Sequence, residues 1–369
     1  MMNWTPEISL DQFAAQVEVA AAAAEYPEAQ EIASNVPIYD ARRAGDAMAR
    51  EWTRVLLDGP GVFVIKHAYA DTSIIDAATA VFRDIIASER AAGKGAGDHF
   101  AAAGANDRVW NSLQKLCMQA PDVYARYMAN PVIALACRAW LGPGYQIATQ
   151  LNVVRPGGKA QQPHRDYHLG FMSADEMRAY PEHVHRLSPT LILQGGVAHC
   201  DMAPESGTTK LLPFSQRYLP GYIAATQDAF RAYFEEHHVQ LPLEKGDAIF
   251  FSPALFHAAG ENRTADVTRT VNLFQTTSAF AQAMESIDRL AMSKAVFPHL
   301  KALEGDDLAA AIAATAAGYS FPTNLDTDPP IDGLAPETQA ALLTRAVAEN
   351  WTAEALSEAL DAQQAKRVA

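Results

Sequence analysis

The feature that most constrains the fold is a series of short β-prone segments in the middle of the chain. They cover residues 146–154, 190–197, 210–213, 248–251 and 268–277. These segments are rich in Val, Ile, Phe and Thr and are separated by turn-forming residues, a pattern typical of an antiparallel barrel or sandwich. The sequence therefore predicts a mainly β core.

Helical patterns precede this core. An alanine-rich stretch from Leu10 to about Ala33 is expected to be a helix, with Ser9 or Asp11 as the cap near its start. Apolar residues recur at helical spacing between Ile74 and Arg90, and Asn130-Pro131 opens a further helix that Gly142 closes. Between the alanine-rich stretch and the helix that begins near Ile74, residues 61–66 follow a turn signal and predict a buried strand.

We expect three regions that pack as one structural domain. Residues 1–144 form a helix-rich N-terminal region with one core strand near 61–66, and residues 145–280 form the β core. Residues 281–369 return to a helical pattern and form a C-terminal extension, interrupted by a loop at 324–330. The predicted class is thus a mainly β core with flanking helices (α+β).

Charge and cysteine content limit the partners and the location. The formal net charge is −14 and no run of Lys or Arg is dense, so we expect no nucleic-acid partner. No apolar run approaches the length of a membrane span, and the N-terminal residues lack the pattern of a signal peptide. The three cysteines are far apart and form no CxxC pair, which favours a reducing, cytoplasmic location. The expected partner is a small-molecule substrate, and the oligomeric state is left open.

A His-x-Asp pair near the start of the β core is the first candidate for chemistry. His164 and Asp166 are two residues apart, so in an extended chain both side chains point to the same side. His257 follows a glycine turn and the apolar segment 248–251, and it is the candidate third ligand. Two imidazoles and one carboxylate bind Fe(II) and leave three adjacent positions open.

The open positions suggest what such a site does. 2-Oxoglutarate can occupy two of them through a carboxylate and its keto oxygen, which leaves one for O2. The far carboxylate of this co-substrate then needs a fixed cation, and Arg269 lies about one dozen residues after His257 on the next predicted strand. Arginine suits this role because its planar guanidinium binds a carboxylate through two hydrogen bonds.

These residues resemble the phytanoyl-CoA dioxygenase-like (PhyH) branch of the Fe(II)/2-oxoglutarate oxygenases. The similarity runs from about Gln146 to Thr277, and it is carried by the segment His164-Arg165-Asp166-Tyr167-His168, the turn and strand before His257, the sequence Gly260-Glu261-Asn262-Arg263, and Arg269. The resemblance implies a double-stranded β-helix, a jelly-roll, cupin-like barrel. It also implies that His164, Asp166 and His257 bind iron and that Arg269 binds the tail of 2-oxoglutarate.

The chain departs from the family pattern at two places. Many members carry Pro-Gly-Ser-His before the last strands, where this chain has Pro213-Phe214-Ser215-Gln216. Many also place a serine two residues after the distal histidine to assist the co-substrate carboxylate, where this chain has Ala259. The resemblance thus leaves one co-substrate hydrogen bond without a donor.

Other residues compete for the same roles. A second His-x-Asp pair, His199 and Asp201, also precedes His257, and Arg263 is a rival to Arg269 for the carboxylate. We prefer the first pair because it lies in the family-like context, and we prefer Arg269 because Arg263 lies in a turn.

Four further residues near the motif are candidate contacts. Gln150 and Asn152 are candidates for binding the co-substrate, and the alternative is ordinary hydrogen bonding elsewhere. Tyr167 and His168 are candidates for touching substrate, and exposure without a role is the alternative for His168. His185 is expected to be a surface loop residue.

The sequence therefore predicts a dioxygenase that hydroxylates an aliphatic C–H bond of an unidentified small molecule. Its cofactors would be Fe(II), 2-oxoglutarate and O2, and succinate and CO2 would be released. The alternatives are a non-oxygenase, metal-binding cupin-like barrel that acts as an isomerase or small-molecule binding protein, and a catalytically silent relative. Consumption of 2-oxoglutarate distinguishes the predicted dioxygenase from both alternatives.

Overall fold

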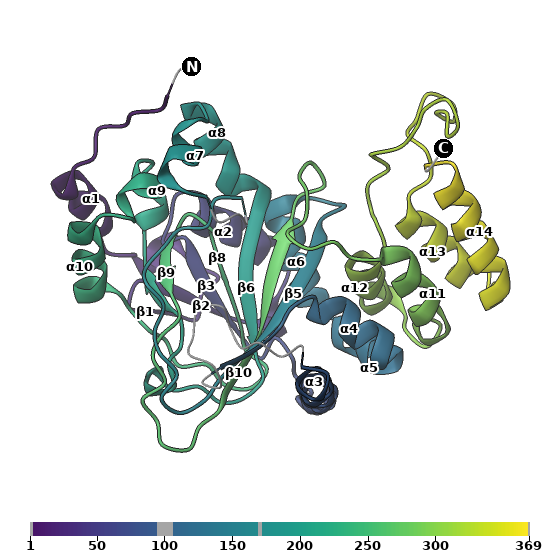
Figure 1. The fold of residues 1–369 in the computed structure, drawn as a ribbon, viewed down its shortest axis with the longest axis horizontal. Helices are drawn as coiled ribbons and strands as arrows, with labels where there is room; N and C mark the ends of the chain where they lie inside the picture. Colours follow the sequence, from purple (N-terminus) through teal and green to yellow (C-terminus); the bar gives the residue numbers. More distant parts are fainter. Residues whose placement is uncertain (1–2, 94–105, 169–171, 368–369) are drawn as a thin grey trace.

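In the computed structural model, which describes residues 3–93, 106–168 and 172–367, eight strands form one large sheet (Figure 1). Their order across the sheet is β1-β2-β3-β8-β6-β10-β5-β4, and among these strands only β2 and β3 pair in parallel. The strands are β1 (Glu31–Ala33), β2 (Val36–Asp40), β3 (Val62–Lys66), β4 (Asn106–Val109), β5 (Gln146–Val154), β6 (Ile192–Ala198), β8 (Ala248–Phe251) and β10 (Arg269–Thr277).

A smaller sheet faces the large one. It pairs β7 (Lys210–Leu212) with β9 (Phe256–Ala258), and single bridges extend it from His164 to His257 and from Leu211 to Val239. Along the chain, extended segments therefore pass repeatedly between the two sheets, as in a jelly roll. The predicted double-stranded β-helix core is confirmed, and each β-prone segment of the sequence corresponds to a strand.

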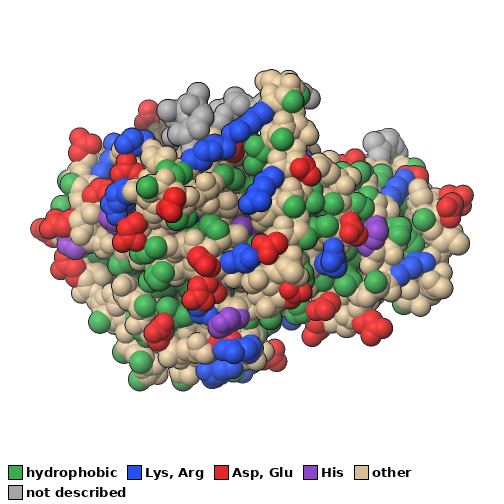
Figure 2. All heavy atoms as spheres, turned by 90° about the horizontal axis from the view of Figure 1, so that it is seen from below, with side chains coloured by type: hydrophobic (Ala, Val, Ile, Leu, Met, Phe, Trp, Pro, Cys, Tyr) green, Lys and Arg blue, Asp and Glu red, His purple; other side chains and the backbone are tan. Residues whose placement is uncertain are grey.

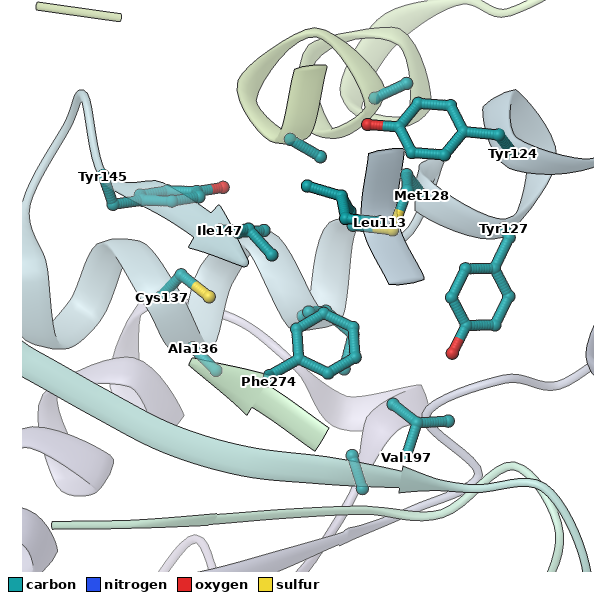
Figure 3. Packing of buried hydrophobic residues seen from close by; sticks show 14 of the residues in the cluster. Leu113, Tyr124, Tyr127, Met128, Ala136, Cys137, Tyr145, Ile147, Val197 and Phe274 are labelled. Carbon is teal, nitrogen blue, oxygen red and sulfur yellow. The ribbon is translucent and has the colours of Figure 1, made fainter. Parts of the chain in front are cut away.

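The main hydrophobic core lies between the large sheet and the helices that cover its outer face. Figure 3 shows Phe274 of β10, Val197 of β6 and Ile147 of β5 packed towards Cys137 and Tyr127, which come from the covering helices. Alternate residues of β5 and β10 face this core, and the residues between them face the space between the two sheets. Both faces are covered, which is why β5 is buried along nearly all its length.

Helices before the β core cover this outer face. Pro131 and the Asn130 cap start α6 as predicted, and Gly142 ends it with a positive φ of 73°. The predicted helix near residues 74–90 is α3. Residues 91–106 are rich in glycine and alanine and are expected to form a loop, but most of them lie outside the described residues. The helices are α2 (Asp46–Leu57), α3 (Ser73–Ala91), α4 (Ser112–Gln119), α5 (Pro121–Met128) and α6 (Pro131–Leu141).

The expected helix from Leu10 to Ala33 is wrong beyond its first third. Ser9 caps α1 (Leu10–Val17), but the chain then leaves the helix and forms the β1–β2 hairpin. The two-residue loop of this hairpin consists of Ser34 and Asn35, whose φ values are 51° and 67°. A loop of two left-handed residues matches the twist of a hairpin, and asparagine tolerates that conformation well. The N-terminal region thus adds β1, β2 and β4 to the sheet as well as the predicted β3.

The C-terminal residues form four helices; the first two pack on α4, α5 and α6, and the last two pack on this first pair (Figure 1). The guanidinium of half-buried Arg289 donates hydrogen bonds to the carbonyl oxygens of Ala314, Thr315 and Ile147, and so ties two of these helices to β5. The main core cluster includes residues from before, within and after the β core. The helices are α11 (Arg289–Leu300), α12 (Gly305–Thr315), α13 (Gln339–Ala348) and α14 (Ala353–Ala365).

The surface carries both signs of charge. Figure 2 shows acidic and basic side chains interspersed over the face seen from below. Interspersed charges do not form the continuous basic surface that binding to a phosphate backbone requires. Among the described residues, no helix has both the length and the apolar composition needed to cross a bilayer.

Candidate metal centre and its cavity

His164 and His257 lie on adjacent extended segments of the smaller sheet. Each backbone N–H donates to the carbonyl oxygen of the other residue, with distances of 3.0 and 3.1 Å, and the two rings are 4.4 Å apart. Asp166 follows two residues later, and its N–H donates to the carbonyl oxygen of Pro253. One ligand atom from each of the three side chains lies within 4.8 Å of the others. The structure therefore brings together the three residues predicted to bind metal.

The imidazoles are oriented by their own backbone. Nδ1 of His164 lies 2.9 Å from the carbonyl oxygen of Gln162, and Nδ1 of His257 lies 2.8 Å from that of Leu255. A carbonyl oxygen only accepts, so each Nδ1 carries the proton and each Nε2 keeps its lone pair. Both Nε2 atoms are directed at Asp166, at 3.9 Å for His164 and 3.7 Å for His257. Metal-binding histidines commonly have this arrangement.

Burial keeps His257 neutral. Removal from water, together with the neighbouring His164, lowers the pKa of His257 to about 4. A neutral imidazole is the form that binds a metal ion. With two such nitrogens and one carboxylate oxygen, the set fits a divalent ion such as Fe(II) and leaves coordination positions for other ligands.

The amide of Gln194 supports the carboxylate from the large sheet. Gln194 lies on β6, and its Nε2 donates to Oδ2 of Asp166. Outer contacts of this kind fix the direction of a ligand oxygen. Sequence reasoning missed Gln194. The signal that could have found it is a single polar residue that directly follows the apolar residues Ile192 and Leu193.

Ser215 has a structural role in the segment 213–216, which departs from the family pattern. Its hydroxyl accepts a hydrogen bond from the N–H of Phe256 at 2.8 Å and donates to the carbonyl oxygen of Leu212 at 2.6 Å. It thereby holds β9, which carries His257, against the segment after β7. The chain keeps the proline and the serine of the family pattern. The two hydrogen bonds of the Ser215 hydroxyl do not involve Gln216, which stands where the family has a histidine.

A cavity of about 730 Å³ lies between the two sheets and includes the three candidate ligands in its wall. Its wall also contains Arg269, Asn152 and Gln150, the predicted co-substrate residues. Apolar side chains form much of the remainder, which suits an organic ligand. Other lining residues include Arg108, Met172, Met177, Gln194, Thr208, Thr209, Tyr222, Thr226, Leu241, Phe251, Leu273, Gln275 and Met284.

Arg269 and the three candidate metal ligands lie at different positions along the direction of the strands that line this cavity. Gln194, which contacts Asp166, pairs with Gln275 across β6 and β10. Arg269 is at the start of β10, six positions before Gln275, which corresponds to about 20 Å of strand. Its guanidinium is buried and donates to the carbonyl oxygen of Gly207. The long arginine side chain can span part of this separation.

The competing residues are placed elsewhere. The ring nitrogens of His199 are engaged by the hydroxyls of Thr79 at 2.8 Å and Tyr127 at 2.9 Å, on the helix-covered side of the sheet. His199 therefore has no nitrogen left for a metal. Arg263 is exposed in its turn and is absent from the cavity wall.

The structure does not bring Tyr167 and His168 to the cavity. Tyr167 is buried among Tyr180, His185 and Tyr222, and neither predicted substrate residue is among the lining side chains. His168 has a φ of 44°, so the extended alternation stops before it. The expectation for His185 was wrong, because it is buried on α8 (Glu182–Leu187) and stacks on Trp4.

Sequence reasoning missed further polar residues in the wall. Arg108 comes from β4, which was not predicted, and its Nη1 donates to Oε1 of Gln150 at 3.1 Å. Met172 and Met177 also line the cavity, Met177 from α7 (Ala174–Arg178). Nothing in the local sequence around Arg108 indicates which way its side chain points.

Comparison with known proteins places this geometry in a family. The model of the family described as "Phytanoyl-CoA dioxygenase (PhyH)" matches residues 57–271, more than half of the chain. The chain is 31% identical over 152 residues to dioxygenase trt7 of Aspergillus terreus, covering 41% of this chain and 48% of that protein. It is 25% identical over 182 residues to peroxisomal phytanoyl-CoA dioxygenase of Rattus norvegicus, covering 45% and 49%. The chain thus spans about half the length of these relatives.

Two of the solved structures that are similar to this chain are described here. One is the alpha-ketoglutarate-dependent carbocyclase SnoK from nogalamycin biosynthesis, with 18% identity, a TM-score of 0.47, and coverage of 72% of this chain and 93% of that chain. The other is EctD from S. alaskensis with bound Fe, with 19% identity, a TM-score of 0.46, and coverage of 65% and 79%. The family match itself covers β3 to the first three residues of β10, including all three candidate ligands. The chain belongs to the phytanoyl-CoA dioxygenase (PhyH) family.

Proposed function

We propose that this protein is an Fe(II)- and 2-oxoglutarate-dependent dioxygenase that hydroxylates an aliphatic C–H bond of a small molecule. The carrying observation is the convergence of His164, Asp166 and His257 at one wall of a cavity that also contains Arg269. These three residues would hold the iron. Iron with 2-oxoglutarate and O2 would supply the oxidising chemistry, with succinate and CO2 as co-products.

The other lining residues fall into two groups, one for 2-oxoglutarate and one for the substrate. Arg269 would bind the far carboxylate of 2-oxoglutarate, and Asn152, whose Oδ1 is buried without a hydrogen-bond partner, would lie beside it. Gln150, Leu273 and Gln275 lie nearer the other end of the strands and would face the substrate. The apolar part of the wall supports an organic skeleton as the substrate. The three cysteines are free, which supports the proposed cytoplasmic location.

The test is release of succinate from 2-oxoglutarate with Fe(II), ascorbate and O2. We expect slow turnover without substrate and faster turnover when a compound that fits the cavity is added. Asp166→Ala and His257→Ala are expected to abolish it, because each removes a ligand. His183→Ala, at an exposed histidine of α8, is the control and is expected to keep wild-type turnover.

The same assay separates this function from the alternatives. A cupin-like isomerase or binding protein would bind metal through the same residues and leave 2-oxoglutarate unconsumed. Turnover that persists in Asp166→Ala would also contradict the proposed ligand set.

A further inference from the structure

Arg165 is a buried cation that the proposed metal and co-substrate sites do not use. It lies between His164 and Asp166 in an extended segment, so its side chain points to the opposite face of the smaller sheet. It is 6% exposed, and its Nη2 donates to the carbonyl oxygen of Ser215. Its Nε and Nη1 are buried without a hydrogen-bond partner. Two of the three guanidinium nitrogens are therefore open to a ligand.

The surroundings of Arg165 are aromatic rather than acidic. The guanidinium lies 5.2 Å from the ring centroid of Tyr222 and 5.0 Å from that of Phe256. Among the described residues, no carboxylate forms an ion pair with it. By contrast, the guanidinium of Arg289 donates to three carbonyl oxygens. A guanidinium that is removed from water without an anion or a full set of acceptors is costly, so the site indicates a missing negative group.

The cavity extends to the face of the smaller sheet on which Arg165 lies. Arg165 is part of the cavity wall, together with residues of α9 (Gly221–Ala224), of the turn after it and of α10 (Asp228–His237). Gly221 makes room for the guanidinium, because a Cβ there would collide with its Cζ. The wall residues from these helices and the turn are Tyr222, Ala225, Thr226 and Arg231. A ligand in this part of the cavity therefore lies beside Arg165.

Arg231 supplies a second cation nearer to solvent. Its side chain is 38% exposed, and its Nε is buried without a hydrogen-bond partner. Its Nη1 lies 3.6 Å from Oδ1 of Asp228, whose side chain is fully exposed, and an ion pair of this kind contributes little. The chain as a whole has a formal charge of −14, so two arginines in one part of the wall are not a consequence of composition.

We propose that Arg165 and Arg231 form a second anion-binding site in the cavity, which takes an oxyanion such as a carboxylate, sulfonate or phosphate group. Arg165 donates from Nε or Nη1 at the inner end, and Arg231 donates from Nε at the outer end. The oxyanion is a free ion or the charged group of an organic ligand. This inference goes beyond the proposed function and holds whether or not the cavity binds 2-oxoglutarate.

The test uses two fluorescent dyes that differ by one charged group. 1-Anilinonaphthalene-8-sulfonate carries a sulfonate, and N-phenyl-1-naphthylamine has the same rings without it. Arg165→Met removes the charge and keeps a long side chain. We expect its dissociation constant for the sulfonate dye, measured by fluorescence titration, to rise about 10-fold or more, since hydrogen bonds to a charged group are lost. The constant for the neutral dye is expected to change less than about 2-fold.

Two further variants complete the design. Arg217→Met is the matched control, because the guanidinium of Arg217 also lies over an aromatic ring, at 4.7 Å from the centroid of Phe214, but is absent from the cavity wall. It is expected to bind both dyes like the wild type. Arg231→Met is expected to weaken binding of the sulfonate dye by about 3-fold. It carries the test alone if Arg165→Met fails to fold, which far-UV circular dichroism checks.

Inorganic sulfate distinguishes the two sources of the oxyanion. Displacement of the sulfonate dye from the wild type by sulfate supports a site for a free ion. A dye that stays bound in sulfate but depends on Arg165 supports an anion carried by an organic ligand.

The outcomes separate this inference from the proposed function. Arg269 is present in every variant, so any binding of dye beside it contributes equally to all of them. Wild-type affinity for the sulfonate dye in both Arg165→Met and Arg231→Met, or an equal loss of affinity for both dyes, would overturn the anion site. The proposed function is tested by succinate release and does not depend on this result.

Discussion

Gln194 ties the large sheet to the candidate metal centre through one amide group. Because its Nε2 donates to Oδ2 of Asp166, it orients the carboxylate without being a ligand itself. We predict that Gln194→Met lowers the affinity for Co(II) by about 10- to 100-fold, the usual effect of removing an outer hydrogen bond to a ligand. Titration followed by the visible spectrum of bound Co(II) measures both the affinity and the ligand geometry.

Gln275→Met is the matched control for this prediction. Gln275 pairs with Gln194 on the neighbouring strand and lines the same cavity, and no hydrogen bond joins it to the three ligands among the described residues. Equal Co(II) affinity and an unchanged spectrum in Gln194→Met would show that the amide does not position Asp166.

At the residue scale, what could be predicted depended on local sequence. His164, Asp166 and His257 were found because alternation and a turn before a strand are local patterns. Gln194 was not found, because its contact with Asp166 comes from the approach of distant segments. The roles of Tyr167 and His168 as substrate contacts stay predictions; neither residue lines the cavity, and His168, with a φ of 44°, has left the extended conformation.

At the scale of elements, β9 depends on a side chain outside its own sheet. Ser215→Ala removes the acceptor for the buried N–H of Phe256. We predict a loss of about 1–3 kcal/mol of unfolding free energy, the cost of a buried group left without its partner. Denaturant unfolding measures this change. Ser88→Ala, on the exposed side of α3, is the control and should leave the unfolding free energy nearly unchanged. Equal effects of the two variants would contradict the stabilising role of the Ser215 hydrogen bond.

A buried polar network links β6 to α3 and α5 through His199. Burial lowers the pKa of His199 to about 3, with a small opposing effect from Asp76. The unfolded chain takes up this proton near pH 6.5 and the folded protein does not, so the stability is complete above pH 6.5 and falls as the pH decreases towards 3. Between pH 7 and pH 5 this one group should cost about 2 kcal/mol.

The measurement compares the wild type with His199→Gln at both pH values. Gln keeps polar atoms for Thr79 and Tyr127 but does not titrate, so the stability of the wild type relative to the variant should decrease as the pH falls. A difference that stays constant between pH 7 and pH 5 would mean that His199 is not held neutral.

Elements with a regular pattern were predicted well, and irregular ones were not. α6 has a cap, an initial proline and a terminal glycine, all visible in sequence. β1, β2 and β4 are short, and their stability comes from pairing with strands of the large sheet rather than from their own composition. The alanine-rich stretch after Val17 had helical propensity, which the hairpin overrides through its Ser34-Asn35 loop.

At the scale of the whole molecule, the C-terminal helices share the main core with the strands. Arg289 lies half-buried at this junction and donates to three carbonyl oxygens from α12 and β5. We predict that Arg289→Met lowers the unfolding free energy by about 2 kcal/mol or more, since these acceptors lose a charged donor. Arg186→Met, which removes an exposed pair with Glu182, should change stability by less than about 1 kcal/mol. Similar effects of the two substitutions in denaturant unfolding would contradict this role.

The rung of two backbone hydrogen bonds between His164 and His257 has a consequence for metal exchange. The protein scaffold itself sets the distance between the two imidazoles, so an ion is not required to draw them together. We expect a chelator to remove bound metal without changing the far-UV circular dichroism spectrum, and Mn(II), Co(II) or Ni(II) to enter afterwards. Unfolding on chelation would contradict this expectation. Such a scaffold lets the surrounding supply of metals, rather than the folding reaction, decide which ion the protein carries.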